Sequence, residues 1–290
     1  MRATATWIVA GAVLVLLVAA VADGIRSRAD ASGAPAAPPR VLHGVIVTAD
    51  AACQTRAFRL PSLAPEHAPR PPDCNGLEWS QDGSIVARCR GDFTAVTSSD
   101  GIQFPNVDGC APAWRGDGAL SVVRDGNIVI ARRRGAPFIV FSRPQLTEAL
   151  RAAGVEDPGE WTFAQVSWFG LTSLVAILQK PGDSAAAVFA QGGVETFVPH
   201  IGAHIEDLRA SPIGNFAFAR VDPEREYVML SRGGDPISLP AVRGATAIAW
   251  SPDERYVAIS TDDETTVART GTTKAIATLP FGAHALDWLS

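Results

Sequence analysis

The chain has 290 residues, a formal net charge of −5 at pH 7 and 47% hydrophobic residues. It is long enough to bury a large core, and its negative charge gives no general attraction to the phosphates of nucleic acid. We therefore expect a globular protein that does not bind nucleic acid. The one concentrated basic stretch, residues 132–134, consists of three arginines and is expected to be a solvated strand end before Gly135.

The first 22 residues predict targeting to a membrane. Residues 7–22 carry no charge and consist mostly of Val, Ala and Leu. As a transmembrane anchor the segment spans residues 3–22, close to the roughly 20 residues that a bilayer requires. As a signal peptide it has Arg2, an apolar centre and a small-residue cleavage site at Ala22. We prefer the single-pass anchor; a secreted protein, cleaved at Ala22, is the alternative, and both place the remaining chain on the extracytoplasmic side.

Residues 23–40 form a compositionally distinct segment. They are rich in Ala, Gly, Ser and Pro and have no apolar period, which predicts a flexible linker. The expected organisation is therefore an anchor or signal segment at 1–22, a linker at 23–40 and a folded domain at 41–290.

The predicted domain repeats one short phrase, in which a Trp ends an apolar run and precedes a polar turn and a second apolar run. The clearest copy covers residues 248–260, Ile-Ala-Trp-Ser-Pro-Asp-Glu-Arg-Tyr-Val-Ala-Ile-Ser. A period near 40 residues with several short strands in each repeat is typical of a β-propeller. The aligned positions are Trp79, Trp114, Trp168, Ala210, Trp250 and Trp288.

The two ends of the chain complement each other. The last repeat supplies only a first strand, residues 286–289, whereas residues 41–63 supply outer strands that lack a Trp-bearing first strand. Joining them completes a sixth blade and removes an open sheet edge. We therefore predict an all-β, six-bladed β-propeller with one blade closed by both chain ends, preceded by an N-terminal apolar helix and a flexible linker.

The phrases at Trp79 and Trp250 resemble the TolB-type, WD-repeat-like propeller repeat, whose signature is roughly W-S-P-D-G followed by a short apolar strand. The resemblance covers most of residues 41–290 and implies the propeller fold. TolB itself looks like a periplasmic binding protein with an extra α/β domain before its propeller, and no segment of this sequence matches that domain.

Four cysteines suggest disulfide bonds. Cys53 and Cys74 are 21 residues apart, and so are Cys89 and Cys110. Both pairs occupy nearly the same place in consecutive repeats, so we predict the bridges Cys53–Cys74 and Cys89–Cys110, as suits an exported domain. Zinc binding is disfavoured by the lack of a C-x-x-C pair, and reduced buried thiols are the other alternative.

Residues 142–153 interrupt the repeats and predict a short helix. Residues 142–145 read as a capping box with Pro in the first turn, and Gly154 fits the C-terminal cap. Leu146 and Leu150 fall on one helical face. We expect an insertion packed on the rim of the propeller; a docking element is the alternative, because loops on this fold commonly carry function.

The search for catalytic motifs is negative. The sequence contains no G-x-S-x-G, H-E-x-x-H, G-x-x-x-x-G-K or G-x-G-x-x-G motif, and we predict no cofactor. His200 and His204 are four residues apart, but Gly-Ala-His recurs at 282–284, so a repeat position explains them better than a metal site. The aligned tryptophans are expected to pack between blades rather than to form a ligand cage.

The residue before each aligned Trp lies on the first strand, which is nearest the central axis. Glu78 and Asp287 occupy this position in neighbouring blades, and Arg209 occupies it in a more distant blade. Two carboxylates should therefore approach each other near the channel, where like charges raise one pKa. We expect a hydrated channel with screened charges; a weak cation or polar-ligand site is the alternative, since propeller channels can hold ions through oxygen ligands.

Two functions fit these patterns. The first is a non-catalytic propeller, tethered to the membrane, that binds another protein or a cell-envelope component. The second is a propeller hydrolase of the lactonase or glycan-cleaving type, which would use acidic residues at the channel mouth. The fold hosts both classes, and the missing catalytic motifs favour the binding module.

Overall fold

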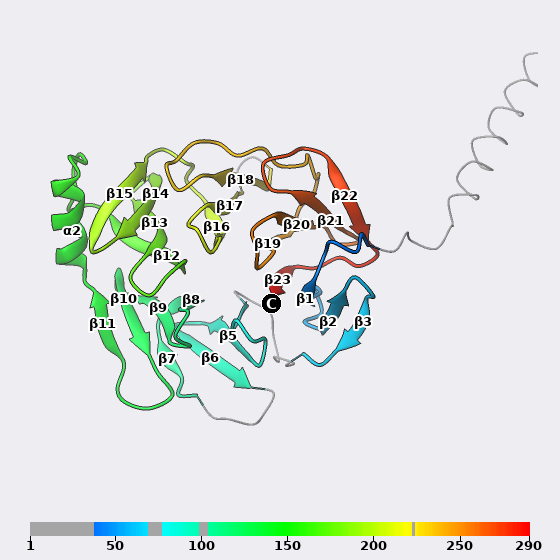
Figure 1. Ribbon diagram of the computed structural model, residues 1–290. Helices are drawn as coiled ribbons and strands as arrows, with labels where there is room; N and C mark the ends of the chain where they lie inside the picture. Colours follow the sequence, from blue (N-terminus) through cyan, green and yellow to red (C-terminus); the bar gives the residue numbers. More distant parts are fainter. Residues whose placement is uncertain (1–37, 69–76, 99–103, 222–223) are drawn as a thin grey trace, which may run out of the picture. The chain divides into compact units, whose positions relative to one another are not determined.

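The computed structural model describes residues 38–68, 77–98, 104–221 and 224–290. They form six small antiparallel sheets arranged around a common axis (Figure 1), which confirms the predicted six-bladed all-β propeller. The predicted anchor or signal segment at 1–22 lies outside the described residues, as does the linker up to residue 37. In the part of the chain that is described, no helix has the length and apolar character needed to cross a bilayer.

Each blade is numbered here in chain order, and its strands run from the axis outwards. Blade one contains β23 (Ala285–Leu289), β1 (Gly44–Ala49), β2 (Thr55–Leu60) and β3 (Ala64–Glu66). Blade two contains β4 (Glu78–Trp79), β5 (Ile85–Arg90), β6 (Phe93–Ser98) and β7 (Val107–Asp108). Blade three contains β8 (Cys110–Trp114), β9 (Leu120–Arg124), β10 (Asn127–Ala131) and β11 (Phe138–Phe141).

The remaining blades follow the same order with one exception. Blade four contains β12 (Thr162–Trp168), β13 (Leu174–Lys180), β14 (Asp183–Ala190) and β15 (Gly193–Val198). Blade five contains β16 (Ile205–Ala210), β17 (Phe216–Arg220) and β18 (Glu226–Leu230). Blade six contains β19 (Ala247–Trp250), β20 (Tyr256–Ser260), β21 (Thr265–Arg269) and β22 (Ala275–Leu279).

Blade five departs from the expected four strands. Only an isolated bridge, between Leu230 and Pro236, stands where an outermost strand would pair with β18. Pro236 and Pro240 have no backbone N–H to donate to a ladder, which explains why this segment does not form a regular strand.

The core lies between blades, because the middle strands are buried on both faces. Val175 and Ile177 of β13 pack against Phe216 and Phe218 of blade five. The alternate residues of β13, which include Leu178, belong to a cluster shared with blade three. Alternate residues of β13 therefore face two different blades, which explains why nearly all residues of this strand are apolar.

The repeated Ser-x-Asp turn has a physical role in this arrangement. The Ser80 hydroxyl donates to the Asp82 carboxylate at 2.7 Å and accepts from the Ile85 amide at 3.0 Å. In blade six, Ser251 makes the equivalent bonds to Asp253 at 2.7 Å and from the Tyr256 amide at 3.0 Å. In these two blades the turn thus fixes the start of the second strand to the end of the first, where the aligned Trp stands.

The ring closes through blade one as predicted. β23 is the innermost strand of this blade and pairs with β1 in the register Val45 to Leu289 and Val47 to Asp287. Leu286 and Trp288 of β23 are buried in the core between blades one and six. Closure therefore depends on the last repeat.

Deleting residues 285–290 should lower the melting temperature by more than about 10 °C, because the loss of two large buried side chains costs several kcal/mol and each kcal/mol shifts the melting temperature by about 2–4 °C at this chain length. Thermal unfolding followed by circular dichroism checks this. Removal of the exposed Ser290 alone is the matched control and should leave the melting temperature unchanged. An equal melting temperature for both deletions would contradict the closure.

One predicted disulfide is confirmed. Cys89 of β5 is bonded to Cys110 of β8, with their Cα atoms 5.0 Å apart, so the bridge joins blade two to blade three. These two cysteines are therefore neither a zinc site nor reduced thiols. Cys53 is also disulfide-bonded. Its predicted partner, Cys74, lies outside the described residues.

Replacing Cys89 and Cys110 together by Ser should reduce the free energy of unfolding by about 3 kcal/mol, because the bridge closes a loop of 21 residues. Urea unfolding of the variant and the wild type measures the difference.

Peptide mapping under non-reducing conditions tests the second bridge, for which we expect a Cys53–Cys74 crosslink. Recovery of Cys53 linked to Cys110 instead would show that the repeat argument is wrong.

The predicted helix is present as α2 (Arg143–Ala152), on the outer edge of the ring beside β15 (Figure 1). The side chains of Ser142 and Gln145 form the expected capping box. At the other end the Gly154 amide donates to the Arg151 carbonyl at 3.0 Å, with φ of 76° at Gly154. Leu146 and Leu150 are fully buried in the core between blades three and four, so α2 is packed on the rim as expected.

Candidate functional site at the channel mouth

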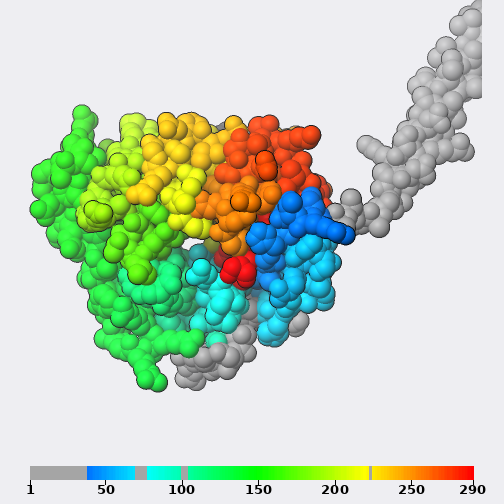
Figure 2. All heavy atoms as spheres, in the orientation of Figure 1, coloured from blue at the N-terminus to red at the C-terminus, as the bar shows by residue number. Residues whose placement is uncertain are grey.

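A hollow of about 310 Å³ opens at the centre of the ring, where the first strands end. Figure 2 shows the opening beside the red atoms of the C-terminal strand. The hollow is lined by Glu78, Arg209 and Asp287, so the structure brings the three predicted channel residues together. Its aromatic walls come from the aligned positions Trp79, Trp114, Trp168, Trp250 and Trp288.

The Arg209 side chain crosses the channel. Arg209 lies on β16 of blade five and Glu78 on β4 of blade two, which is the opposite blade of the ring. The Nη1 of Arg209 nevertheless forms an ion pair with the Glu78 carboxylate, and Nη2 donates to the Leu77 carbonyl at 3.3 Å. Sequence reasoning placed Arg209 on a distant blade but did not foresee that its long side chain reaches the carboxylates.

Two further members of the cluster were missed by sequence reasoning. The Asp207 Oδ1 accepts from Arg209 Nε at 2.9 Å, and Oδ2 accepts from the Tyr227 hydroxyl. β16 changes register between Glu206 and Arg209, and Asp207 has φ of 49°. This bulge turns Asp207 toward Arg209, and a bulge of this kind leaves no signal in the sequence.

Burial sets the electrostatics of the cluster. Burial raises the pKa of the Glu78 carboxyl to about 8; the Arg209 guanidinium opposes this rise, and Asp287 and Asp207 add to it. Burial likewise raises the pKa of Asp287, against the effect of Arg209. The Glu78 side chain is 19% exposed and that of Arg209 12%, so water screens this pair only partly. At neutral pH, burial therefore favours the protonated form of Glu78, against the attraction of Arg209 for its carboxylate.

The raised pKa of Glu78 makes the stability of the fold depend on pH. Between the ordinary value of 4.5 and about 8, the folded state binds a proton that the unfolded state has released. The free energy of unfolding should therefore fall as the pH rises from about 5 to 8. Glu78→Gln should flatten this fall, whereas Asp263→Asn, in an exposed turn, should not. Urea unfolding at several pH values between 5 and 8 measures the free energy of unfolding. If this energy fell as steeply in Glu78→Gln as in the wild type, the fall would not be due to Glu78.

The geometry favours a polar-ligand site over a metal site. The Arg209 guanidinium lies between Glu78 and Asp207, where a bound cation would otherwise neutralise the carboxylates. Across the described ranges, no group of three or more His, Cys, Asp or Glu side chains is arranged to hold a metal ion. His200 Nδ1 lies 2.9 Å from Asp183 Oδ2, away from the channel; the His200 side chain is exposed and that of Asp183 is half-buried.

The tryptophans pack between blades, as expected, and also form the walls of the hollow. The Trp114 indole donates to the Glu78 carbonyl of the preceding blade at 2.9 Å, and the Trp168 indole donates to Ser121 Oγ of its preceding blade at 2.7 Å. The Arg115 guanidinium lies over the Trp168 ring, 5.6 Å from its centre. Two of the five walls, Trp114 and Trp168, are therefore held by hydrogen bonds that connect successive blades.

Comparisons with known proteins support the fold. No protein-family model and no curated protein matches the sequence. The chain is similar to the β-propeller domain of Cps50 (Swd1) from Myceliophteria thermophila, with 14% identity and a TM-score of 0.52 over 85% of this chain and 90% of that one. It is also similar to a protein of unknown function from Bacteroides caccae, with 12% identity and a TM-score of 0.54 over 86% and 99%. These likenesses show the propeller fold alone, and the TolB-type resemblance remains a prediction.

Proposed function

We propose that this protein is a non-catalytic binding module that holds a polar group of a protein or cell-envelope ligand at the channel mouth. Residues 3–22 would tether it to the membrane with the propeller on the extracytoplasmic side. The observation that carries the proposal is the hollow itself, in which Trp walls surround a half-buried cluster of Glu78, Arg209 and Asp287. Concave sites with apolar walls and a few converging polar groups are the usual form of ligand sites.

The bonding within the cluster supports binding rather than catalysis. Glu78 is paired with Arg209, and Asp207 is bonded to both Arg209 and Tyr227. Asp287 accepts from the Trp288 amide at 2.9 Å. A general base needs a free lone pair aimed at the substrate, and at least one oxygen of each of these carboxyl groups is already engaged by the protein.

The charge of the cluster indicates the ligand class. Three carboxyl groups, on Glu78, Asp207 and Asp287, lie near two guanidinium groups, that of Arg209 and that of Arg225, which donates to the Tyr227 hydroxyl. Aromatic walls attract cations through their ring faces. We therefore expect a cationic group, such as a lysine side chain, to bind better than an anionic group, and to bind more tightly as the pH rises through the Glu78 pKa of about 8.

Nuclear magnetic resonance titration with the blocked tripeptides acetyl-Gly-Lys-Gly-amide, acetyl-Gly-Gln-Gly-amide and acetyl-Gly-Glu-Gly-amide tests this. The lysine peptide should shift the indole signals of the Trp walls and bind about tenfold more tightly than the glutamate peptide. Glu78→Gln with Asp287→Asn should remove this preference, and the exposed Asp263→Asn should keep it. Equal binding of all three peptides would refute the proposed ligand class.

One observation keeps the hydrolase as a second candidate. A carboxyl with a pKa of about 8, as in Glu78, is protonated at neutral pH and is suited to act as a general acid. A panel of lactones, esters and glycosides distinguishes the two functions. Turnover by the wild type that is lost in Glu78→Gln would replace the binding proposal with a hydrolase.

A further inference from the structure

A second surface, away from the channel, has the features of a docking site. β11 is the outermost strand of blade three and pairs only with β10 in the described part of the chain. All four of its residues are large and apolar, yet Phe138 is 47% exposed, Ile139 49% and Val140 36%. An exposed apolar edge strand is a ready template for pairing with another chain.

The corresponding strand of blade four is protected. β15 carries Glu195, which pairs with Arg232 at 2.6 Å, and Thr196, which donates to the Arg232 carbonyl at 2.8 Å. A segment of blade five thus covers this edge with polar contacts, which is a common way to prevent unwanted pairing. β11 has no charged residue, and no such cover lies over it in the described part of the chain.

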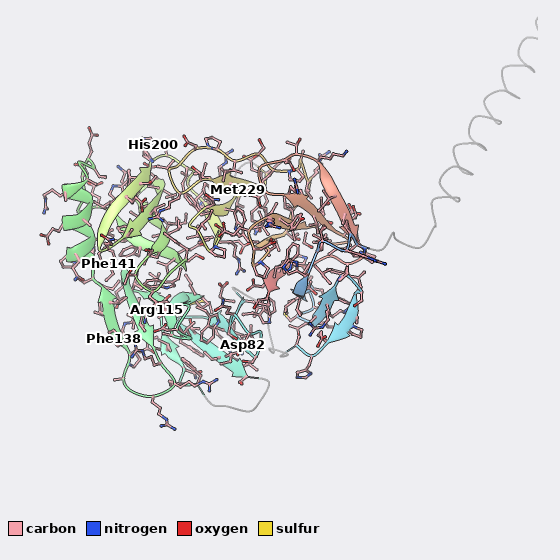
Figure 3. The ribbon with its side chains drawn as sticks, in the orientation of Figure 1. Asp82, Arg115, Phe138, Phe141, His200 and Met229 are labelled. Atoms are coloured by element: carbon pink, nitrogen blue, oxygen red, sulfur yellow. A yellow bond between two sulfur atoms is a disulfide. The ribbon has the colours of Figure 1, made fainter. Side chains whose placement is uncertain are left out.

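An apolar hollow lies next to β11. It has a volume of about 630 Å³ and lies between β11, α2 and blade four. Val140 and Phe141 line one side, Ala149 and Ala152 of α2 line another, and the 57% exposed Leu171 stands at its border. Figure 3 shows Phe138 and Phe141 on the outer part of the ring, with Arg115 on the side toward the channel. Side chains of an added strand could therefore be buried here.

The charges around β11 are asymmetric. The exposed arginines 132–134 directly precede the strand. Arg132 lies 3.7 Å from Asp117, and its guanidinium stands over the Phe138 ring at 6.0 Å from the centre. Arg133 and Arg134 have no ion pair with a described residue. The first end of β11 therefore presents two exposed arginines, Arg133 and Arg134, next to the Arg132–Asp117 pair.

We propose that β11 binds an extended segment of a partner protein as an added antiparallel strand. The segment places apolar side chains in the hollow beside α2 and ends in acidic residues. An antiparallel strand that begins opposite Phe141 ends opposite Phe138, so the residues that follow it reach Arg133 and Arg134. Main-chain bonds to the free edge provide affinity, while the hollow and the arginines provide specificity. The proposed docking site therefore includes the part of the propeller rim that α2 forms.

Two other occupants fit the surface less well. Residues 23–37 of the same chain carry Arg26 and Arg28 and no acidic residue beyond Asp23 and Asp30, so they do not complement three arginines. A second copy, paired through its own β11, would bring the basic end of one strand beside Arg143 of the other. Both are tested as alternatives below.

The test uses a fluorescein-labelled peptide, Thr-Val-Thr-Val-Thr-Val-Glu-Glu-Glu, and a matched peptide ending in three lysines. Fluorescence anisotropy measures binding to the full chain, and hydrogen exchange locates it. We expect the acidic peptide to bind about tenfold more tightly than the lysine peptide and to slow amide exchange within residues 138–141. Arg133→Glu with Arg134→Glu should reverse the preference, and Ile139→Lys should abolish binding of both peptides.

Matched controls separate this surface from nonspecific effects. Ile213→Lys changes an apolar residue that is 62% exposed on another blade, and Arg243→Glu changes an exposed arginine; neither should alter binding. Equal binding of both peptides, protection outside 138–141, or protection of β11 by self-association without peptide would overturn the proposal. The double variant Glu78→Gln, Asp287→Asn should still bind the acidic peptide at β11. A loss of peptide binding at β11 can therefore be distinguished from a loss of ligand binding at the channel mouth.

Discussion

The burial of both faces of every blade by its two neighbours is the constraint on which this structure depends. A single four-stranded sheet such as β12–β15 has no layer of its own to cover it, and the apolar side chains on its two faces belong to two different cores. A blade is therefore stable only when both neighbours are present. This requirement explains why the ring must close and why the closing strand contributes buried Leu286 and Trp288 rather than a polar edge.

The same constraint shapes the channel mouth. Because the first strands converge on the axis, residues far apart in sequence meet there at close range, as Glu78 and Arg209 do. Their charges are held partly away from water, and burial outweighs the attraction of the guanidinium in setting the pKa of Glu78. The position that gives these residues a shared hollow also makes their ionisation costly, so the stability of the fold and the proposed ligand binding would depend on the same proton.

The sequence allowed the architecture to be predicted because the repeat has a physical cause. The same turn precedes the second strand in blade two, through Ser80 and Asp82, and in blade six, through Ser251 and Asp253. Because the turn needs these two residues at a fixed spacing, the spacing made the repeat visible in the sequence. The Cys89–Cys110 bridge was predictable for the same reason, since both residues hold repeat positions. The missing fourth strand of blade five and the bulge at Asp207 were not predictable, because each depends on how one segment packs and not on the repeat.

The position of the closing strand has a consequence for the order of folding. Val45 pairs with Leu289, so the inner partner of β1 is the last strand that the chain offers. During synthesis, β1 and β2 therefore emerge long before β23 and present an unpaired inner edge while the intervening blades form. Contacts between such distant positions are slow to form, because the loop that they close is long. Blade one is therefore the last blade of the ring to be completed, and the inner edge of β1 has no strand to pair with until β23 has been made.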